Sequence, residues 1–183
     1  MPRTHKPWVR NDMSNSEKKS AQIIAIDSRK TRAGEGVRGV PKPIRYAYRI
    51  AGCGFLLGEG VLSEVVIAPT LAPVPRSPDW LLGLTNVRGN IVPVFDLWRF
   101  VRTQRPERAT STVLVLDMGT AAVGLLIDEL PKLVPLDSQP AHTLPSAPAL
   151  QPFLGRGLQA LGCEWWEFDH KKFLARLSAV DSR

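Results

Sequence analysis

The segment Trp80–Phe100, WLLGLTNVRGNIVPVFDLWRF, says more about the fold than any other part of the 183-residue chain. Residues 79–82 predict a short helical turn. Residues 91–95 predict a strand whose proline confines it to a sheet edge or a bulge, because proline has no amide hydrogen to donate. Between them, Gly89 permits a tight turn that would present the long, always charged side chain of Arg88 at the surface.

The end of this segment has an echo later in the chain. Residues 95–100 and 168–173 share the pattern Phe-Asp-x-x-x-Phe, 73 positions apart. In each copy the aspartate is placed to cap the N-terminus of a helix, and the two phenylalanines are spaced to contact each other across its first turn. The repeat predicts two related modules in which a strand passes into a helix in the same way.

The surrounding sequence alternates short apolar stretches with turns rich in Gly and Pro. Periodicity predicts further strands at 44–50, 55–57, 61–67, 113–116, 121–127, 130–136, 158–161 and 165–168, and a final helix at about 170–178. Many short strands with few long helices are typical of small β-barrels.

The positive charge is confined to the N-terminal part of the chain. Residues 1–45 hold 11 Lys and Arg against 4 Asp and Glu, whereas residues 46–183 are neutral. The polar, basic composition predicts a flexible extension over residues 1–43, a folded domain over 44–178 and a short C-terminal tail over 179–183.

The basic extension has two interpretations. It is either a solubilising tail, in which the apolar run at 23–26 is a docking segment, or an arm that touches phosphates or an anionic membrane surface. The N-terminus shows no signal-peptide pattern, and no apolar stretch is long enough for a bilayer span. We therefore expect a cytoplasmic protein without membrane insertion.

The sequence does not assemble a catalytic or metal site. Cys53 and Cys163 are too far apart in sequence for a metal cluster, and Cys53 is better explained as a small turn residue than as a nucleophile. The three histidines, His5, His142 and His170, have no second ligand at metal-binding spacing. Asp128 and Glu129 are adjacent on an extended segment, so their side chains point to opposite faces and cannot share a proton. These residues predict a binding module with no catalytic residues, metal or cofactor.

Several motifs in order along residues 44–178 resemble the CheW-like family, the coupling proteins of bacterial chemosensory arrays. The matching positions within the central segment are Gly83, Asn86, Val87, Arg88, Gly89, Pro93, Asp96 and Leu97. The flanking stretches VLSEV (61–65), AVGLLIDEL (122–130) and FLGRG (153–157) resemble further family motifs. The shortened last hairpin and the aromatic Trp165–Phe168 depart from the family pattern, and residues 149–153 with this aromatic ending are similar to coupling proteins of pilus-linked systems.

This resemblance implies a mainly β fold: two SH3-like five-stranded β-barrels around a shared core, with short helices. It also implies a non-enzymatic adaptor, peripheral to membrane-bound receptor arrays. Its partners would be the regulatory domain of a CheA-type histidine kinase and the cytoplasmic tip of a methyl-accepting receptor, with a receptor helix laid in an apolar groove between the barrels.

The resemblance also places the partner-binding site. Arg88 matches a family residue on the partner-binding surface, and the alternative is an arginine that bonds carbonyls of its own loop. Glu64 matches a position associated with receptor contact, and the alternative is a solvated strand acid. Val87, Asn86 and Gly89 complete the predicted site, with Asn86 and Gly89 shaping the turn.

A second class of function remains open at this point. SH3-like barrels with a basic arm also bind nucleic acids, although residues 46–183 are neutral and show no alternation of basic and aromatic residues.

Overall fold

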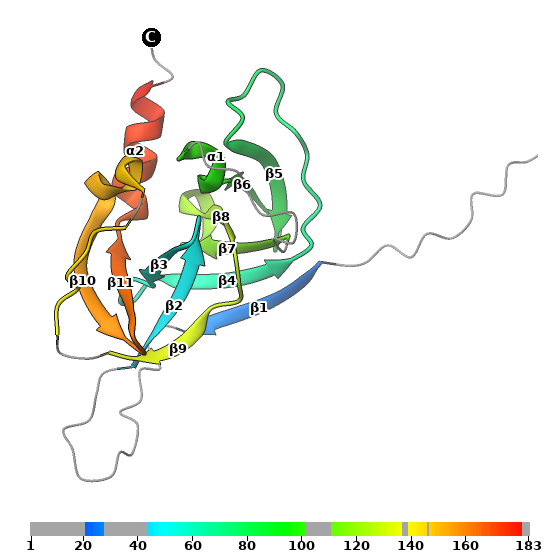
Figure 1. Cartoon of the computed structure of the whole chain (residues 1–183). Helices are drawn as coiled ribbons and strands as arrows, with labels where there is room; N and C mark the ends of the chain where they lie inside the picture. Colours follow the sequence, from blue (N-terminus) through cyan, green and yellow to red (C-terminus); the bar gives the residue numbers. More distant parts are fainter. Residues whose placement is uncertain (1–20, 28–43, 102–110, 137–138, 146, 181–183) are drawn as a thin grey trace, which may run out of the picture.

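The computed structural model of the chain describes residues 21–27, 44–101, 111–136, 139–145 and 147–180. These residues form two β-sheets with short helices packed at their ends (Figure 1). The first sheet has the order β1 (Gln22–Asp27), β4 (Leu62–Ile67), β7 (Thr112–Leu116), β8 (Val123–Ile127), β6 (Asn90–Phe95) and β5 (Leu81–Val87). The second has the order β10 (Leu154–Ala160), β11 (Cys163–Phe168), β3 (Cys53–Leu56), β2 (Ile44–Ile50) and β9 (Lys132–Pro135). The helices are α1 (Leu97–Phe100) and α2 (His170–Val180), with 3₁₀ turns η1 (Gly119–Ala121) and η2 (Pro148–Phe153).

The two sheets repeat one topology once β1 is set aside. The order β4-β7-β8-β6-β5 corresponds strand for strand to β9-β2-β3-β11-β10. In each module one parallel pair, β6 with β8 or β11 with β3, joins two antiparallel hairpins. The mainly β fold class and the internal duplication are both confirmed.

Each module also bends back on itself at the same place. After β4, Ala72 exchanges two backbone hydrogen bonds of 2.8 Å with Leu84 of β5, at the far end of the sheet order. After β9, Pro140 forms the equivalent bridge with Leu158 of β10, flanked by a 3.0 Å bond from the Ala141 amide to the Gly157 carbonyl. These contacts draw the ends of each five-stranded unit together, as in a small barrel.

Three apolar clusters form the core, one within each module and one between the two modules. The first lies within the first module and contains Val66, Val87, Val92, Val94, Val113, Val115, Ala122 and Leu126. The second lies within the second module and contains Ala47, Leu56, Val134, Leu136, Leu158, Ala160 and Trp165. The largest cluster takes residues from both sheets and from α2, including Tyr48, Phe55, Leu114, Leu125, Phe168 and Phe173, all of them buried. The predicted shared core is therefore present.

The strand-to-helix transitions follow the sequence repeat. Asp96 caps α1 by accepting a 2.9 Å hydrogen bond from the Trp98 amide, and Asp169 accepts one of 2.9 Å from the Lys172 amide at the start of α2. In the second copy the rings of Phe168 and Phe173 lie 5.6 Å apart, as the repeat predicts. In the first copy Trp80 contacts both phenylalanine rings.

Two local expectations are corrected by the structure. Leu81 and Leu82 begin β5 rather than a helical turn, because antiparallel pairing with β6 extends to the Leu81–Phe95 pair. The strand containing Pro93 is not at a sheet edge. The irregularity that was the other expectation does lie beside it, between Leu81 and Gly83 of β5, and pairing with β8 is restricted to Val94 and Phe95. The proline therefore lies where only one neighbouring strand is paired.

The predicted flexible extension contains a strand. Residues 22–27 pair antiparallel with β4 along its whole length, from Gln22 opposite Ile67 to Asp27 opposite Leu62. Ile26 is buried in the shared core, and this apolar anchor explains why the segment joins the sheet. The expectation of a flexible segment is thus wrong for residues 22–27, and the rest of the extension lies outside the described residues.

We expect β1 to stabilise the fold without being required for it. A chain shortened to begin at residue 44 loses one strand pairing and the burial of Ile26, and should still unfold cooperatively with about 1–3 kcal/mol less stability. A chain beginning at Ala21 keeps β1 and should match the full chain. Denaturant unfolding of the three chains measures this, and loss of the cooperative transition in the shortest chain would show that β1 is indispensable.

Gly83 makes the closure of the first module possible. Its φ is +143°, and a Cβ there would lie 2.4 Å from the Ala72 carbonyl oxygen. Gly83→Ala should therefore cost about 2–4 kcal/mol, through backbone strain and the broken bridge. The matched control is Gly60→Ala, whose φ is +73° but whose added Cβ meets nothing within 4 Å. Equal melting temperatures for the two variants would contradict this account of the closure.

Candidate partner-binding site

The tip of the β5–β6 hairpin is a rigid two-residue turn. Arg88 and Gly89 have φ values of 51° and 85°, the positive pair that matches the twist of the flanking strands. The Asn86 side-chain oxygen accepts a 2.9 Å hydrogen bond from the Gly89 amide. Val87 is buried in the core of the first module and anchors the base of the turn. The turn therefore fixes where the Arg88 side chain leaves the backbone.

The Arg88 side chain pairs with Glu64. Its Nε atom lies 2.8 Å from Oε1 and 3.0 Å from Oε2 of that carboxylate. Glu64 is on β4, which is separated from β5 and β6 in the sheet order by β7 and β8, so the pair spans the mouth of the curled sheet. The structure thus brings together two residues that the sequence predicted separately, and it shows Arg88 paired with an acid of its own barrel rather than with loop carbonyls.

Exposure differs sharply between the two partners. The Glu64 side chain is 14% exposed, whereas that of Arg88 is 54% exposed. Glu64 therefore cannot be a solvated strand acid, because its carboxylate is largely covered and committed to Arg88. The arginine is held through one nitrogen by a nearly buried acid while more than half of its side chain faces solvent.

A shallow hollow surrounds this pair. It is lined by Glu64, Val87, Arg88, Asn90, Val92, Val115, Asp117, Met118, Gly119 and Ala122. Met118, beside η1, is a half-exposed apolar side chain at its rim. Asp117 is held by α2, because its carboxylate lies 2.9 Å from His170 Nε2 and 3.6 Å from Lys171 Nζ. The hollow thus combines one exposed cation with an apolar floor and rim.

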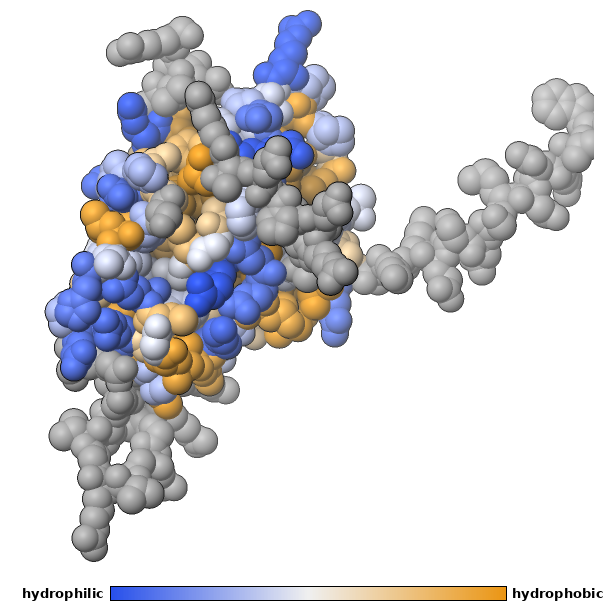
Figure 2. Space-filling view, in the orientation of Figure 1, coloured by the Kyte–Doolittle hydropathy of each residue, from blue (hydrophilic) through white to orange (hydrophobic). Residues whose placement is uncertain are grey.

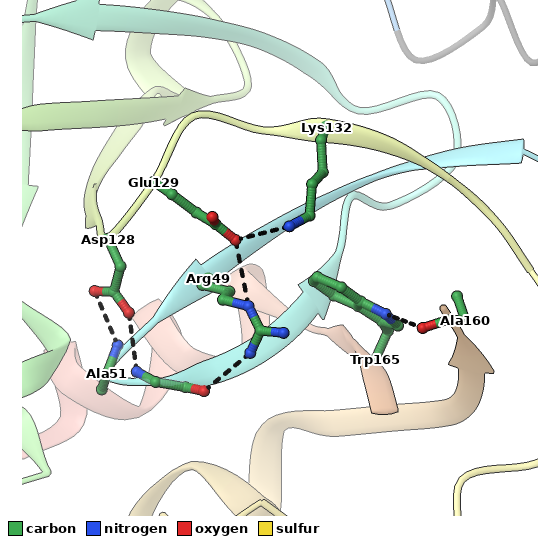
Figure 3. Close-up of polar contacts among 8 residues, drawn as sticks. Arg49, Ala51, Asp128, Glu129, Lys132, Ala160 and Trp165 are labelled. Atoms are coloured by element: carbon green, nitrogen blue, oxygen red, sulfur yellow. Dashed lines mark hydrogen bonds and ion pairs between the residues drawn. The ribbon is translucent and has the colours of Figure 1, made fainter. Parts of the chain in front are cut away.

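A second polar cluster joins the modules (Figure 3). Asp128 follows β8 directly and accepts hydrogen bonds from the backbone amides of Ala51 (3.3 Å) and Gly52 (2.9 Å) at the β2–β3 turn. It also accepts a 2.7 Å bond from the Trp98 indole. Its neighbour Glu129 points elsewhere and pairs with Arg49. The two acids bind different partners, as the opposite directions of their side chains predict. Asp128 thereby connects the end of β8 in the first module to the β2–β3 turn in the second.

The sequence missed the structural role of Asp128, although one signal was available. An acid directly after a fully buried strand is poorly solvated, and it requires hydrogen-bond donors. The Asp117–His170 contact left no comparable signal, because the two residues are 53 positions apart and only the fold brings them together.

The described residues offer little for catalysis. No group of three or more His, Cys, Asp or Glu among them could hold a metal ion. Cys53 is the first residue of β3 rather than a turn residue, and burial raises the pKa of its thiol, so the reactive thiolate is disfavoured. Glu164 has a lowered pKa because its carboxylate accepts hydrogen bonds from Thr143 and from the His142 amide, which identifies it as a loop anchor. None of the helices that the structure describes could cross a membrane.

Two related β modules that share one core and present a charged hairpin tip define the class of protein. The fold matches the crystal structure of the scaffolding protein TtCheW from Thermoanaerobacter tengcongensis, with a TM-score of 0.57 and 17% sequence identity over 73% of this chain and 88% of that one. At the sequence level, the model of the CheW-like domain matches residues 48–157. The chain belongs to the CheW-like family.

Relatives of known name agree with this assignment. Protein PilI of Pseudomonas aeruginosa is 29% identical over 78% of this chain and 84% of its own length. Protein FrzA of Myxococcus xanthus is 34% identical over 53% of this chain and 56% of its own. The chemotaxis protein CheW of Klebsiella aerogenes is 32% identical over 49% of this chain and 55% of its own. The PilI match therefore includes most of both chains, whereas the other two cover about half.

Proposed function

We propose that this protein is a non-enzymatic adaptor that couples a methyl-accepting chemoreceptor to a CheA-type histidine kinase. The observation that carries the proposal is the Arg88–Glu64 pair. A rigid turn and a nearly buried acid hold an arginine whose side chain is 54% exposed. An oriented, partly solvated arginine is the type of side chain that anchors reversible protein interfaces.

The surroundings of Arg88 define the chemistry of the partner surface. Glu64 neutralises only the Nε side of the guanidinium, so the partner should present a carboxylate or a backbone carbonyl to the rest of that group. Met118 at the rim adds an adaptable apolar contact. We assign the kinase regulatory domain to this surface, because a modest polar contact at a barrel end suits a related double β module. The receptor contact associated with the Glu64 position is therefore set aside in favour of an apolar groove.

A receptor helix requires a different surface. An apolar hollow of about 560 Å³ lies where the helices of the two modules meet, lined by Phe100, Ala149, Pro152, Phe153, Lys172, Ala175, Arg176 and Leu177. An amphipathic helix could place its apolar face there, and Lys172 and Arg176 at the rim favour acidic residues beside that face. An adaptor with two separate surfaces can hold both partners at once.

The resemblance of residues 149–153 and of the aromatic β11 to coupling proteins of pilus-linked systems supports a role in such a system. The PilI match covers most of both chains, which supports placing this protein in a subgroup of the family. The chemistry proposed for the two surfaces does not depend on which motility apparatus is controlled.

Titration of the purified chain against each partner tests the proposal. The partners are the kinase regulatory domain and the receptor tip from the same organism, and each should bind separately and reversibly. RNA and DNA should not be retained in filter binding at either low or high salt. Salt-sensitive retention of nucleic acid, with no binding to either protein, would favour the alternative of a nucleic-acid-binding protein.

A further inference from the structure

Helix α2 is connected to both of the hollows proposed as partner surfaces. At its first turn, His170 Nε2 lies 2.9 Å from Oδ2 of Asp117. Asp117 in turn lines the hollow around Arg88, which we call the Arg88 hollow. Further along the helix, Ala175 and Leu177 line the apolar hollow. Helix α2 therefore borders the apolar hollow directly and reaches the Arg88 hollow through Asp117.

The contact between His170 and Asp117 is largely shielded from solvent, because the two side chains are 8% and 20% exposed. The first module fixes the backbone of Asp117, whose amide donates a 2.9 Å hydrogen bond to the Leu62 carbonyl. Helix α2 of the second module holds the Asp117 side chain, through His170 and through Lys171 Nζ at 3.6 Å. The Asp117 wall of the Arg88 hollow thus depends on where α2 lies relative to the first module.

The apolar hollow spans the same junction between α2 and the first module. Phe100, on α1 of the first module, lines one part of it, and Ala175 and Leu177 of α2 line another. Figure 2 shows hydrophobic surface beside the place that α2 takes in Figure 1. A helix seated in this hollow contacts both sides of the junction, so it restrains the position of α2 relative to the first module. The contact between His170 and Asp117 restrains the same relative position.

Two restraints on one relative position reinforce each other. Helices that couple binding sites commonly shift by about 1–2 Å between states. A shift of that size would stretch the 2.9 Å contact at His170 beyond hydrogen-bond range, which ends at about 3.2 Å. An occupant of the apolar hollow that prevents this shift keeps the Asp117 wall in place. A partner bound at the Arg88 hollow favours the same position of α2, because coupling between two binding sites is reciprocal.

We propose that α2 couples the two partner surfaces, and that His170 is the positioning residue through which occupancy of the apolar hollow strengthens binding at the Arg88 hollow. His170 itself lines neither hollow, so it acts through Asp117. This inference rests on the adaptor function proposed above and adds regulation to it. An adaptor that already holds a receptor binds the kinase more tightly than a free adaptor does.

Titration calorimetry of the full chain with the kinase regulatory domain, with and without a saturating amount of the receptor tip, measures the coupling. We expect the receptor tip to tighten kinase binding about fivefold, and the kinase domain to tighten receptor binding by the same factor. His170→Phe keeps an aromatic ring but removes the nitrogen that faces Asp117, so the ratio of the two affinities should fall to about one. His170→Gln, whose amide can donate to Asp117, should retain part of the coupling.

Two further variants separate coupling from stability. Asp117→Gly suits the positive φ of 60° at this position, breaks the same contact from the first module and should also give a ratio of about one, even should His170→Phe not fold. Thr143→Val removes a hydroxyl that donates to Glu164 and lines neither hollow, so it should keep the fivefold ratio.

The outcomes distinguish this inference from the adaptor function. A wild-type ratio of one, with both partners bound, would overturn the coupling and leave the adaptor function standing. So would a fivefold ratio that survives in His170→Phe, even with a lower melting temperature, because the contact would then be purely structural. Failure of either partner to bind the wild type would remove the adaptor function, and the coupling with it.

Discussion

Replacing Arg88 with alanine should weaken binding to the kinase regulatory domain about thirtyfold or more, because a central arginine anchor contributes about 2 kcal/mol or more to an interface. Stability should fall by about 1–2 kcal/mol, because the arginine itself is 54% exposed but the Glu64 carboxylate, 14% exposed, loses its partner. Arg88→Glu should bind more weakly still, since it places like charges together at the hairpin tip and opposes an acidic partner. Calorimetric titration and a melting curve for each variant measure both quantities.

A charge exchange separates binding from structure. In the double variant Glu64→Arg with Arg88→Glu, the ion pair can form again with its polarity reversed. If Arg88 contacts the partner, stability should recover while kinase binding stays lost. Recovered binding would mean that the pair acts only by holding the hairpin. Unchanged affinity in Arg88→Ala would remove this residue from the site.

Phe173→Ala should lower the stability of the whole fold by about 3–5 kcal/mol, the usual range for deleting a large buried aromatic side chain. Phe173 is fully buried on α2, and its ring lies 5.1 Å from that of Phe100, 5.3 Å from that of Phe153 and 5.6 Å from that of Phe168. It therefore connects α1 of the first module to the end of the second. Denaturant unfolding gives the free energy of the change.

The control for this prediction preserves most of the volume. Phe173→Leu keeps an apolar side chain in the cluster and should cost clearly less than the alanine variant. Both variants should unfold in a single transition, because the shared core couples the modules. Two separated transitions in Phe173→Ala would show that the modules are stable independently and that α2 only bridges them.

The sequence was most informative where local rules determine the structure. The repeated Phe-Asp pattern predicted both helix starts, and Asp96 and Asp169 cap them in the structure. The same 73-residue spacing relates the turn at Arg88 and Gly89 to the turn at Leu161 and Gly162, where φ is again positive at both residues. Capping and two-residue turns depend on neighbours in sequence, so their signals are readable without the fold.

Long-range contacts account for what the sequence did not show. The sequence predicts Arg88 and Glu64 as site residues, but their pairing depends on the curvature of a sheet in which β7 and β8 lie between β4 and the β5–β6 hairpin. Strand β1 is hard to recognise in the sequence because, of residues 22–26, only Ile26 is buried, which leaves little hydrophobic pattern to distinguish the strand from a polar extension. The sequence predicts a helical turn at Leu81 and Leu82 because nothing in these residues themselves shows that Leu81 pairs with Phe95 of β6.

The most direct test of the adaptor role is co-sedimentation with receptor-bearing membranes. The kinase regulatory domain should sediment with membranes that display the receptor tip only when this protein is added, and Arg88→Glu should leave the kinase domain in the supernatant while the variant itself still sediments. Sedimentation of the kinase domain to the same extent with and without the protein, or with the wild type and Arg88→Glu alike, would contradict coupling through this hairpin.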